Sequence, residues 1–428
     1  MSNFRPSMKH GLFLYLLLFL ATPAFCQVDT VQQVIPNRKN SAVQQKKPYV
    51  ILISADGFRY DYAQKYHASH LFALANSGVK ADYMLPSYPS LTFPNHYAII
   101  TGLTPAHSGI VGNNFYDVKR KETYFSKNRK NITDSTWYGG TPLWVLAEQQ
   151  QMVSATNYWV GSDAGVKNTF PTYYYNYSEK IDINTRIQAI FNWLELPADI
   201  RPHFMTFYLP QADYYGHRYT PDSPETETAV KFVDSVVYEL TKAVKTTGLD
   251  VNFVFVSDHG MIKTDNTNPI SIPAIVDTAK YTAWGDVPVV SLYAKQGADI
   301  QADYKAMKAK ADGYDVYLKT TMPRRFGYGA ADDRCNRIGD IILVAKWPNV
   351  FQFGNYSIHP GQHGYDVKKV PEMRATFYAW GPAFKKNQTI RPFKNVNVYN
   401  LIARTLGLKI SEKVDGNDKL ADKILLSK

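Results

Sequence analysis

Short apolar runs typical of buried strands alternate with amphipathic segments along most of the chain. Strands are expected at residues 49–54, 152–158, 204–209, 251–257, 340–345 and 375–380, and helices at 61–76, 184–194, 226–245 and 396–406. Strands that alternate with helices form a sheet with helices packed on it. The sequence therefore predicts an α/β fold, a doubly wound central sheet flanked by helices on both faces.

Length and composition agree with one large folded domain that carries an insertion. The chain has 428 residues, of which 45% are hydrophobic and 20% charged, and this excludes a disordered or fibrous polymer. The domain is expected over 47–428, with a small inserted α+β subdomain over 264–338, where the pattern is irregular and interrupted by Gly and Pro. The formal charge is +11, but the basic residues are scattered, so specific nucleic-acid binding is not expected.

The first 26 residues have the pattern of a secretory signal peptide. Basic residues precede an apolar run over 12–21, and Ala24 and Cys26 stand three residues and one residue before an expected cleavage ahead of Gln27. This run is too short to cross a bilayer, and no later run is long enough, so no membrane span is predicted. We expect a periplasmic or secreted protein. The alternative makes Cys26 a lipid-modified terminus, although Phe25 stands where a small residue is wanted.

Residues 27–46 are polar and lack periodicity, so they are predicted to form a linker between the export signal and the domain. Cleavage before Gln27 would leave Cys335 as the last cysteine of the chain. No intrachain disulfide is then expected, even in an oxidising compartment.

Three of the expected strands are followed by acidic residues, two of them with a histidine nearby. The side chains are Asp56 after the first strand, Asp213 and His217 after the strand at 204–209, and Asp258 and His259 after the strand at 251–257. The ligand crevice of an open α/β sheet lies at the carboxyl ends of its strands, so these side chains would converge. Carboxylates and imidazoles without thiolates suit zinc or a similar cation. Each motif alone also fits an ordinary cap or turn, but three together favour a metal site.

Two further motifs offer a ligand and a nucleophile. A Gly-rich loop carries His359 and His363, and their spacing does not decide which of them would join a metal site. Thr92 lies at the start of a helix expected to continue to Gly102, where the positive end of the helix dipole favours a phosphate or an alkoxide. A threonine at this position is also an ordinary cap.

Five segments carry these residues in order along the chain. They are LISADGFRYDY, YPSLTFPNHYAIITGLTPAHSGIVGNNFYD, DYYGHRYTPDSPE, VFVSDHGM and GQHGYD. Together they resemble the nucleotide pyrophosphatase/phosphodiesterase family of the alkaline phosphatase superfamily, over about residues 48–408. The resemblance implies an exported bacterial hydrolase that cleaves nucleotide phosphodiester or pyrophosphate bonds through a phosphothreonine and releases nucleoside monophosphates.

The resemblance also implies roles for individual residues. One zinc ion would be held by Asp213, His217 and His363, and a second by Asp56, Asp258 and His259, with Thr92 in contact with the second. Asn113 would bind a non-bridging phosphoryl oxygen, and Phe93 and Tyr174 would stack on a nucleoside base. Tyr173 and Tyr175 stay alternatives to Tyr174, and the alternation of Tyr173, Tyr175 and Tyr177 is also that of an edge strand.

Two other functions compete with this interpretation. A phosphate monoesterase of the superfamily would need added cationic donors, commonly a Lys-x-Arg pair near residues 162–166, and that pair is absent from this segment. A catalytically silent metal-binding relative would lack at least one ligand, whereas all six ligands and Thr92 are present. We therefore expect nucleotide-bearing diesters to be preferred over monoesters.

Overall fold

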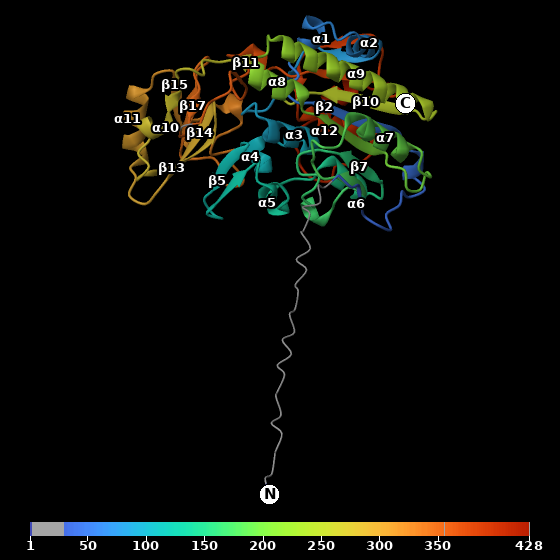
Figure 1. The fold of residues 1–428 in the computed structure, drawn as a ribbon, viewed down its shortest axis with the longest axis horizontal. Coiled ribbons are helices and arrows are strands. Elements are labelled where there is room, and N and C mark those ends of the chain that lie inside the picture. Colours follow the sequence, from blue (N-terminus) through green and yellow to red (C-terminus); the bar gives the residue numbers. More distant parts are fainter. Residues whose placement is uncertain (2–29, 355, 428) are drawn as a thin grey trace.

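The computed structural model describes Met1 and residues 30–354 and 356–427. Within this part of the chain, nine strands form one sheet (Figure 1). Their order is β1 (Gln33–Val34), β8 (Tyr173–Tyr175), β7 (Ser154–Asn157), β9 (Phe204–Leu209), β2 (Tyr49–Ala55), β10 (Val251–Val256), β19 (Phe377–Trp380), β3 (Val79–Ala81) and β20 (Gln388–Ile390). The strands from β8 to β10 are parallel, while β1 and β19 are antiparallel to their neighbours, so the sheet is mixed.

Helices cover both faces of this sheet, which confirms the predicted fold class. One face packs against α1 (Tyr62–Lys65), α2 (Ser69–Ser77), α7 (Ile183–Leu194) and α9 (Pro224–Thr246), and the other against α3 (Thr92–Thr101), α6 (Leu143–Gln149), α12 (Asn397–Leu406) and α13 (Lys419–Ile424). Strand β2 shows why, because Val50 and Leu52 enter one core while Ile51 and Ile53 enter the other. The sequence of a strand that is buried on both faces is a continuous apolar run.

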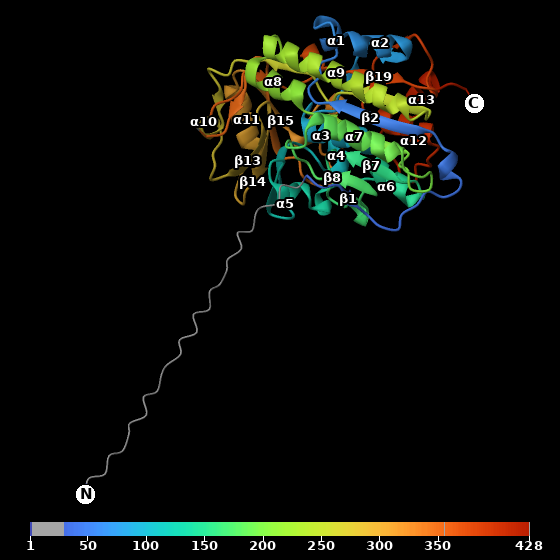
Figure 2. The same cartoon turned by 45° about the vertical axis from the view of Figure 1, so that its right-hand side comes forward.

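A second, smaller sheet forms a subdomain at one end of the molecule (Figures 1 and 2). Its strands, in order, are β13 (Tyr281–Asp286), β14 (Val289–Ala294), β16 (Ile341–Ala345) and β15 (Tyr314–Leu318), and α10 (Ile272–Ile275) and α11 (Ile300–Lys310) accompany them. The sequence assigned the run at 340–345 to the main sheet, but it pairs with β14 and β15. The subdomain thus extends beyond residue 338. The sequence of this run could not show which sheet it joins. Ile341 and Ile342 enter different cores, so β16 is buried on both faces, as a central strand of the main sheet would be.

The helix predicted over 61–76 is also divided. Its two parts are α1 and α2, and His67 between them has a φ of 52°, which no α-helix contains. Four further pairs of short strands form separate two-stranded sheets: β4 (Met84–Leu85) with β21 (Phe393–Lys394), β5 (Asn114–Asp117) with β6 (Glu122–Phe125), β11 (Ile262–Lys263) with β18 (Gly361–Gln362), and β12 (Ile270–Ser271) with β17 (Phe351–Gln352). The other helices that position the site are α4 (Pro105–Ser108), α5 (Arg129–Ile132) and α8 (Gln211–Tyr219).

The described part of the segment predicted as a linker is folded onto the domain. Strand β1 pairs with β8 at the edge of the main sheet, and Asn40 is 4% exposed. The Asn40 amide donates to the carbonyls of Ala198 and Arg201, at 2.9 and 2.7 Å, and its Oδ1 accepts from Val153 N at 2.7 Å. The polar composition predicted a solvent-exposed linker, but a polar side chain such as Asn40 satisfies buried backbone groups instead of facing solvent.

The predicted signal peptide and Cys26 fall within residues 2–29, outside the described residues, so export stays a prediction. Among the helices that are described, none is both long enough and apolar enough to cross a bilayer.

Replacing Asn40 tests whether this segment contributes to the fold. Asn40→Ala should lower the free energy of unfolding by about 2 to 3 kcal/mol, because three buried backbone groups lose their partners. Chemical denaturation followed by circular dichroism measures the change. Lys39→Ala is the matched control, since Lys39 pairs with Asp199 at the surface and its side chain is 68% exposed. Equal stability of both variants would show that the segment is a dispensable tether.

Candidate active site

Three of the predicted site residues are placed by neighbouring parallel strands. Strands β9, β2 and β10 lie side by side, with Ala55 opposite Leu209 and Ser54 opposite Val256. Asp56 follows β2 directly, Asp258 follows β10 by two residues, and the helix after β9 carries Asp213. The carboxyl ends of parallel strands meet at one edge, so all three carboxylates are brought to the same place.

Two glycines let α8 approach this edge closely. Gly57 has a φ of +63°, and a Cβ there would lie 2.9 Å from Cα of Asp213. A Cβ on Gly361 would lie 1.9 Å from the carbonyl oxygen of Gly216, beside His217. Any side chain at either position would separate the backbones that carry Asp56, Asp213 and His217.

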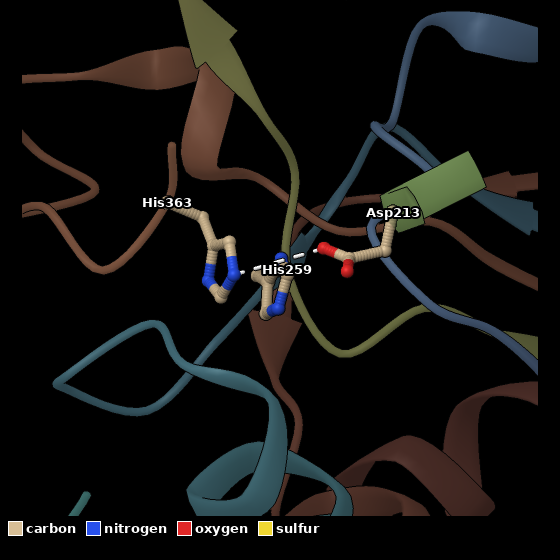
Figure 3. A group of neighbouring side chains, drawn as sticks. All are labelled: Asp213, His259 and His363. Carbon is tan, nitrogen blue, oxygen red and sulfur yellow. Dashed lines mark ion pairs between the residues drawn. The ribbon is translucent and has the colours of Figure 1, made fainter. Parts of the chain in front are cut away.

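The six predicted ligands form one continuous cluster. The ligand atoms of Asp56, Asp258 and His259 lie within 4.8 Å of one another, and so do those of Asp213, His259 and His363. Figure 3 shows the last three side chains pointing toward one another from separate elements. His217 joins this second group, since its Nε2 is 3.4 Å from Asp213 Oδ1 and 3.1 Å from His363 Nε2. His259 belongs to both groups and so connects them.

The backbone fixes how the imidazoles of the cluster present their nitrogens. Nδ1 of His217, His259 and His363 lies 2.7, 2.8 and 3.0 Å from the carbonyl oxygens of Gly361, Gly260 and Ser90, respectively. Because a carbonyl only accepts, each Nδ1 is the donor, and a neutral ring then presents the Nε2 lone pair to the cluster. Two such lone pairs face each other at 3.1 Å between His217 and His363, an arrangement that a shared cation stabilises.

The carboxylates are a stronger reason for a cation. Burial, together with repulsion from Asp258 and Asp213, raises the pKa of Asp56 well above its ordinary value, and desolvation raises the pKa of Asp213 to about 7. Burial lowers the pKa of His259, but the surrounding carboxylates outweigh it and raise that pKa to about 9. Asp258 keeps a low pKa because His259 and His96 outweigh its desolvation. Charged carboxylates at the strand ends are therefore unfavourable unless a proton or a cation compensates them.

Unpartnered oxygens show where that cation would bind. Asp56 Oδ1 and Asp213 Oδ1 are buried without a hydrogen-bond partner among the described residues, while Asp258 Oδ2 lies 2.9 Å from His259 Nε2 and 3.3 Å from His96 Nδ1. Buried carboxylate oxygens are normally paired or coordinate a metal. Oxygen and imidazole donors suit zinc, so the residues fit the metal that the sequence predicts.

Neighbouring groups hold the buried acids in place. The Tyr208 hydroxyl donates to Asp56 Oδ2 at 2.6 Å, and the backbone N of Gly57 donates to Asp258 Oδ1 at 3.1 Å. His96 Nδ1 lies 3.3 Å from Asp258 Oδ2. Tyr208 is not among the residues predicted from the sequence. It lies in a predicted strand and stands opposite Ser54, two residues before Asp56, which brings its hydroxyl to that carboxylate.

Thr92 is the first residue of α3 and faces the cluster. Its Oγ1 is 3.2 Å from His259 Nε2, and its side chain is only partly buried, so the hydroxyl is accessible. Asn113 lies beside it, because its Oδ1 accepts from the backbone N of Phe93 at 2.9 Å. That bond orients the amide and leaves Nδ2 of Asn113 as the free donor of this side chain.

The two aromatic residues predicted to hold a base lie in different surroundings. Phe93 is half-buried, and its ring meets Tyr124 edge to face at 6.3 Å between centroids. Tyr174 lies on β8 and stacks on Phe170 at 5.3 Å. Strands β7 and β9 separate β8 from β2, the strand that ends next to Asp56, so Tyr174 lies two strands away from the strand that leads to this carboxylate.

Tyr177 is 42% exposed and contacts Tyr208, the residue that donates to Asp56, with 6.1 Å between ring centroids. Its position favours Tyr177 over Tyr174 as the tyrosine at the site.

The cluster is open to solvent on one side. The side chains of Asp213 and His217 are 20% and 23% exposed, whereas those of Asp258 and His259 are fully buried. The exposed His359 has its ring centroid 6.4 Å from that of His217. Desolvation lowers the pKa of His217 to about 4, and the cation of Lys127 is near enough to add to this shift.

A hydroxyl beside a cluster of carboxylates and imidazoles that could hold a metal ion is an arrangement found in metal-dependent phosphoryl-transfer hydrolases. The family described as "Type I phosphodiesterase / nucleotide pyrophosphatase" matches residues 50–366 of this chain. The chain belongs to this family of hydrolases, as its motifs predicted.

Relatives and solved structures agree with this assignment. An uncharacterized pyrophosphatase/phosphodiesterase of Schizosaccharomyces pombe is 31% identical over 92% of this chain and 84% of its own length. Ectonucleotide pyrophosphatase/phosphodiesterase family member 3 of Rattus norvegicus is 32% identical, and the match covers 85% of this chain but 42% of the rat protein. The structure of murine ectonucleotide pyrophosphatase/phosphodiesterase 5 is 29% identical, with a TM-score of 0.82, over 88% of this chain and all of that one.

Metal binding at this cluster should stabilise the folded protein against unfolding. Adding Zn²⁺ to chelator-treated protein should raise the free energy of unfolding by about 4 kcal/mol when free Zn²⁺ exceeds Kd by about 1,000-fold. The melting temperature measures this independently of activity. Asp258→Asn should lose most of the shift, and Asp340→Asn, in the small sheet, should keep it. An unchanged melting temperature of the wild-type protein with and without Zn²⁺ would argue against a metal at this cluster.

Proposed function

We propose that this protein hydrolyses nucleotide phosphodiester or pyrophosphate bonds with Thr92 as nucleophile and two zinc ions as cofactors. The observation that carries the proposal is the 3.2 Å approach of Thr92 Oγ1 to His259, inside a cluster of unpartnered carboxylate oxygens. A structure similar to this one supports it: an inactive threonine-to-alanine variant of murine ectonucleotide pyrophosphatase/phosphodiesterase 5 in complex with AMP, 28% identical with a TM-score of 0.82.

Zinc, when bound, would supply positive charge to the entering and leaving oxygens. Asp56, Asp258 and His259 would hold one ion beside Thr92, and Asp213, His217 and His363 the other. The Thr92 hydroxyl releases its proton to solvent as Oγ1 forms a bond to phosphorus and the bond to the leaving oxygen breaks, which gives a phosphothreonine that still carries the nucleoside. Asn113 Nδ2 donates to a non-bridging oxygen as its charge grows. Water then cleaves the phosphothreonine, releasing a nucleoside monophosphate and restoring the hydroxyl.

The leaving group would occupy the open side of the site. In-line displacement places the leaving oxygen opposite Thr92, toward Asp213, His217 and His363. The positive charge of Lys127 acts on this side, where it adds to the lowering of the His217 pKa. A cation there favours an anionic leaving group such as pyrophosphate over a neutral alcohol. It also gives the competing monoesterase function a cation that the motif segments themselves lack.

Replacement of Thr92 tests the nucleophile. Thr92→Ala should lose nearly all turnover and still bind zinc, because the hydroxyl forms the bond to phosphorus but is not one of the six Asp and His ligands. Thr92→Ser should keep part of the activity. Rates are measured with an aryl nucleotide diester, and zinc by elemental analysis, which should find two ions per chain. Near-normal turnover of the alanine variant would instead indicate attack by water.

Substrate class is tested with two aryl esters that share a leaving group. The nucleotide diester should be cleaved with a higher kcat/KM than the phosphate monoester, because the monoester dianion carries one more charged oxygen and Asn113 is the predicted donor outside the metals. Steady-state kinetics on both esters measure the ratio. Equal efficiency would establish the monoesterase alternative.

Base stacking is tested by comparing three aromatic residues. Phe93→Ala and Tyr177→Ala should each lower kcat/KM for the nucleotide diester by about tenfold, given the usual 1 to 3 kcal/mol of a base–aromatic stack. A methyl aryl diester has no base and should be affected less. Tyr174→Ala is the matched control from the same segment. A larger loss in Tyr174→Ala than in Tyr177→Ala would restore the sequence-based assignment.

A further inference from the structure

Asp286 connects the inserted subdomain to the active site. It is the last residue of β13, and its carboxylate reaches the loop that precedes β5. Asp286 Oδ2 accepts from the backbone N of Asn113 at 3.0 Å, and Oδ1 accepts from Nδ2 of Asn114 at 2.8 Å. Both carboxylate oxygens therefore hold the loop that carries the proposed phosphoryl donor.

The contact between Asp286 and this loop is tight. A Cβ on Gly112 would lie 3.0 Å from Asp286 Oδ2 and 3.1 Å from the carbonyl oxygen of Asn114. The neighbour would have to move for a larger residue to fit. Glycine at this position lets the carboxylate come within hydrogen-bond distance of the backbone of Asn113.

Hydrogen bonds continue from Asn113 to the nucleophile. Asp286 fixes the backbone of Asn113, and the side chain of Asn113 accepts from Phe93 N in the first turn of α3. Thr92 immediately precedes Phe93. A short chain of hydrogen bonds thus runs from the small sheet to the residue beside the nucleophile.

The environment of Asp286 indicates that loop binding is its main interaction. Burial raises the pKa of Asp286 to about 7, and the groups that oppose this are the hydrogen-bond donors of Asn113 and Asn114. A buried carboxylate is costly unless donors satisfy it. Here the donors belong to the active-site loop and not to an arginine or lysine of the small sheet.

We propose that Asp286 is a positioning residue through which the inserted subdomain sets the place of the Asn113 amide beside Thr92. This inference rests on the proposed function, since it takes Asn113 as the donor to the phosphoryl oxygen. It assigns the subdomain a part in catalysis, although none of its residues belongs to the metal-binding cluster.

Kinetics of Asp286 variants test this role. Asp286→Ala should lower kcat for the aryl nucleotide diester by about tenfold and leave KM within about twofold, because a displaced donor acts mainly on the transition state. Asp286→Asn keeps one acceptor oxygen and should lose less, and it also serves if the alanine variant does not fold. Asp340→Asn is the matched control, since Asp340 Oδ2 accepts from Ala294 N at 2.8 Å inside the same small sheet.

A double-mutant cycle separates positioning from general stability. Asn113→Ala should lower kcat by about 100-fold, and adding Asp286→Ala should slow it no further, because Asp286 acts through Asn113. Zinc content and melting temperature should show that each variant is folded. An independent loss in the double variant, or an equal loss in Asp340→Asn, would overturn the inference.

The same experiment distinguishes this inference from the proposed function. Normal kcat of Asp286→Ala beside an impaired Asn113→Ala overturns the inference alone. Full activity of Asn113→Ala overturns both the inference and the role of Asn113. An inactive wild-type protein with all its zinc bound overturns the proposed function, and this inference with it.

Discussion

Repulsion among Asp56, Asp213 and Asp258 is the constraint on which the rest of the site depends. Three carboxylates meet where three parallel strands end, and desolvation and mutual repulsion raise the pKa of Asp56 and Asp213. Either protonation or a bound cation relieves this repulsion, and a cation does so while the carboxylates stay charged. The surrounding imidazoles are fixed by backbone carbonyls so that Nε2 faces the cluster, as expected for metal ligands with ordered orientation.

The cluster is asymmetric, and this asymmetry separates the two ends of a bound phosphoryl group. The side that holds Thr92 is formed by fully buried residues, Asp258 and His259. The side formed by Asp213 and His217 is open and has Lys127 nearby. If Thr92 is the nucleophile, as we propose, its side of the cluster is buried and the opposite side is open, which fits a hydrolase whose leaving groups vary in size.

Much of this fold and site could be predicted from local patterns. The central strands and α9 have clear periodicity, and the Asp and His residues follow strands whose carboxyl ends must meet in a parallel sheet. Errors arose where local pattern and tertiary setting disagree. The run at 340–345 resembles a main-sheet strand because both of its faces are buried, and Asn40 resembles a linker residue because its partners are distant backbone groups.

The sequence alone determined the fold class, the family and the residue types that converge at the strand ends, because these follow from periodicity and from motifs contiguous in the chain. Only the tertiary structure decided which distant side chains touch. It placed Tyr177 beside Tyr208, Lys127 near His217, and Asp286 against Asn113, 173 residues away along the chain. Such contacts depend on how the small sheet and the loops pack, and no local sequence pattern records that packing.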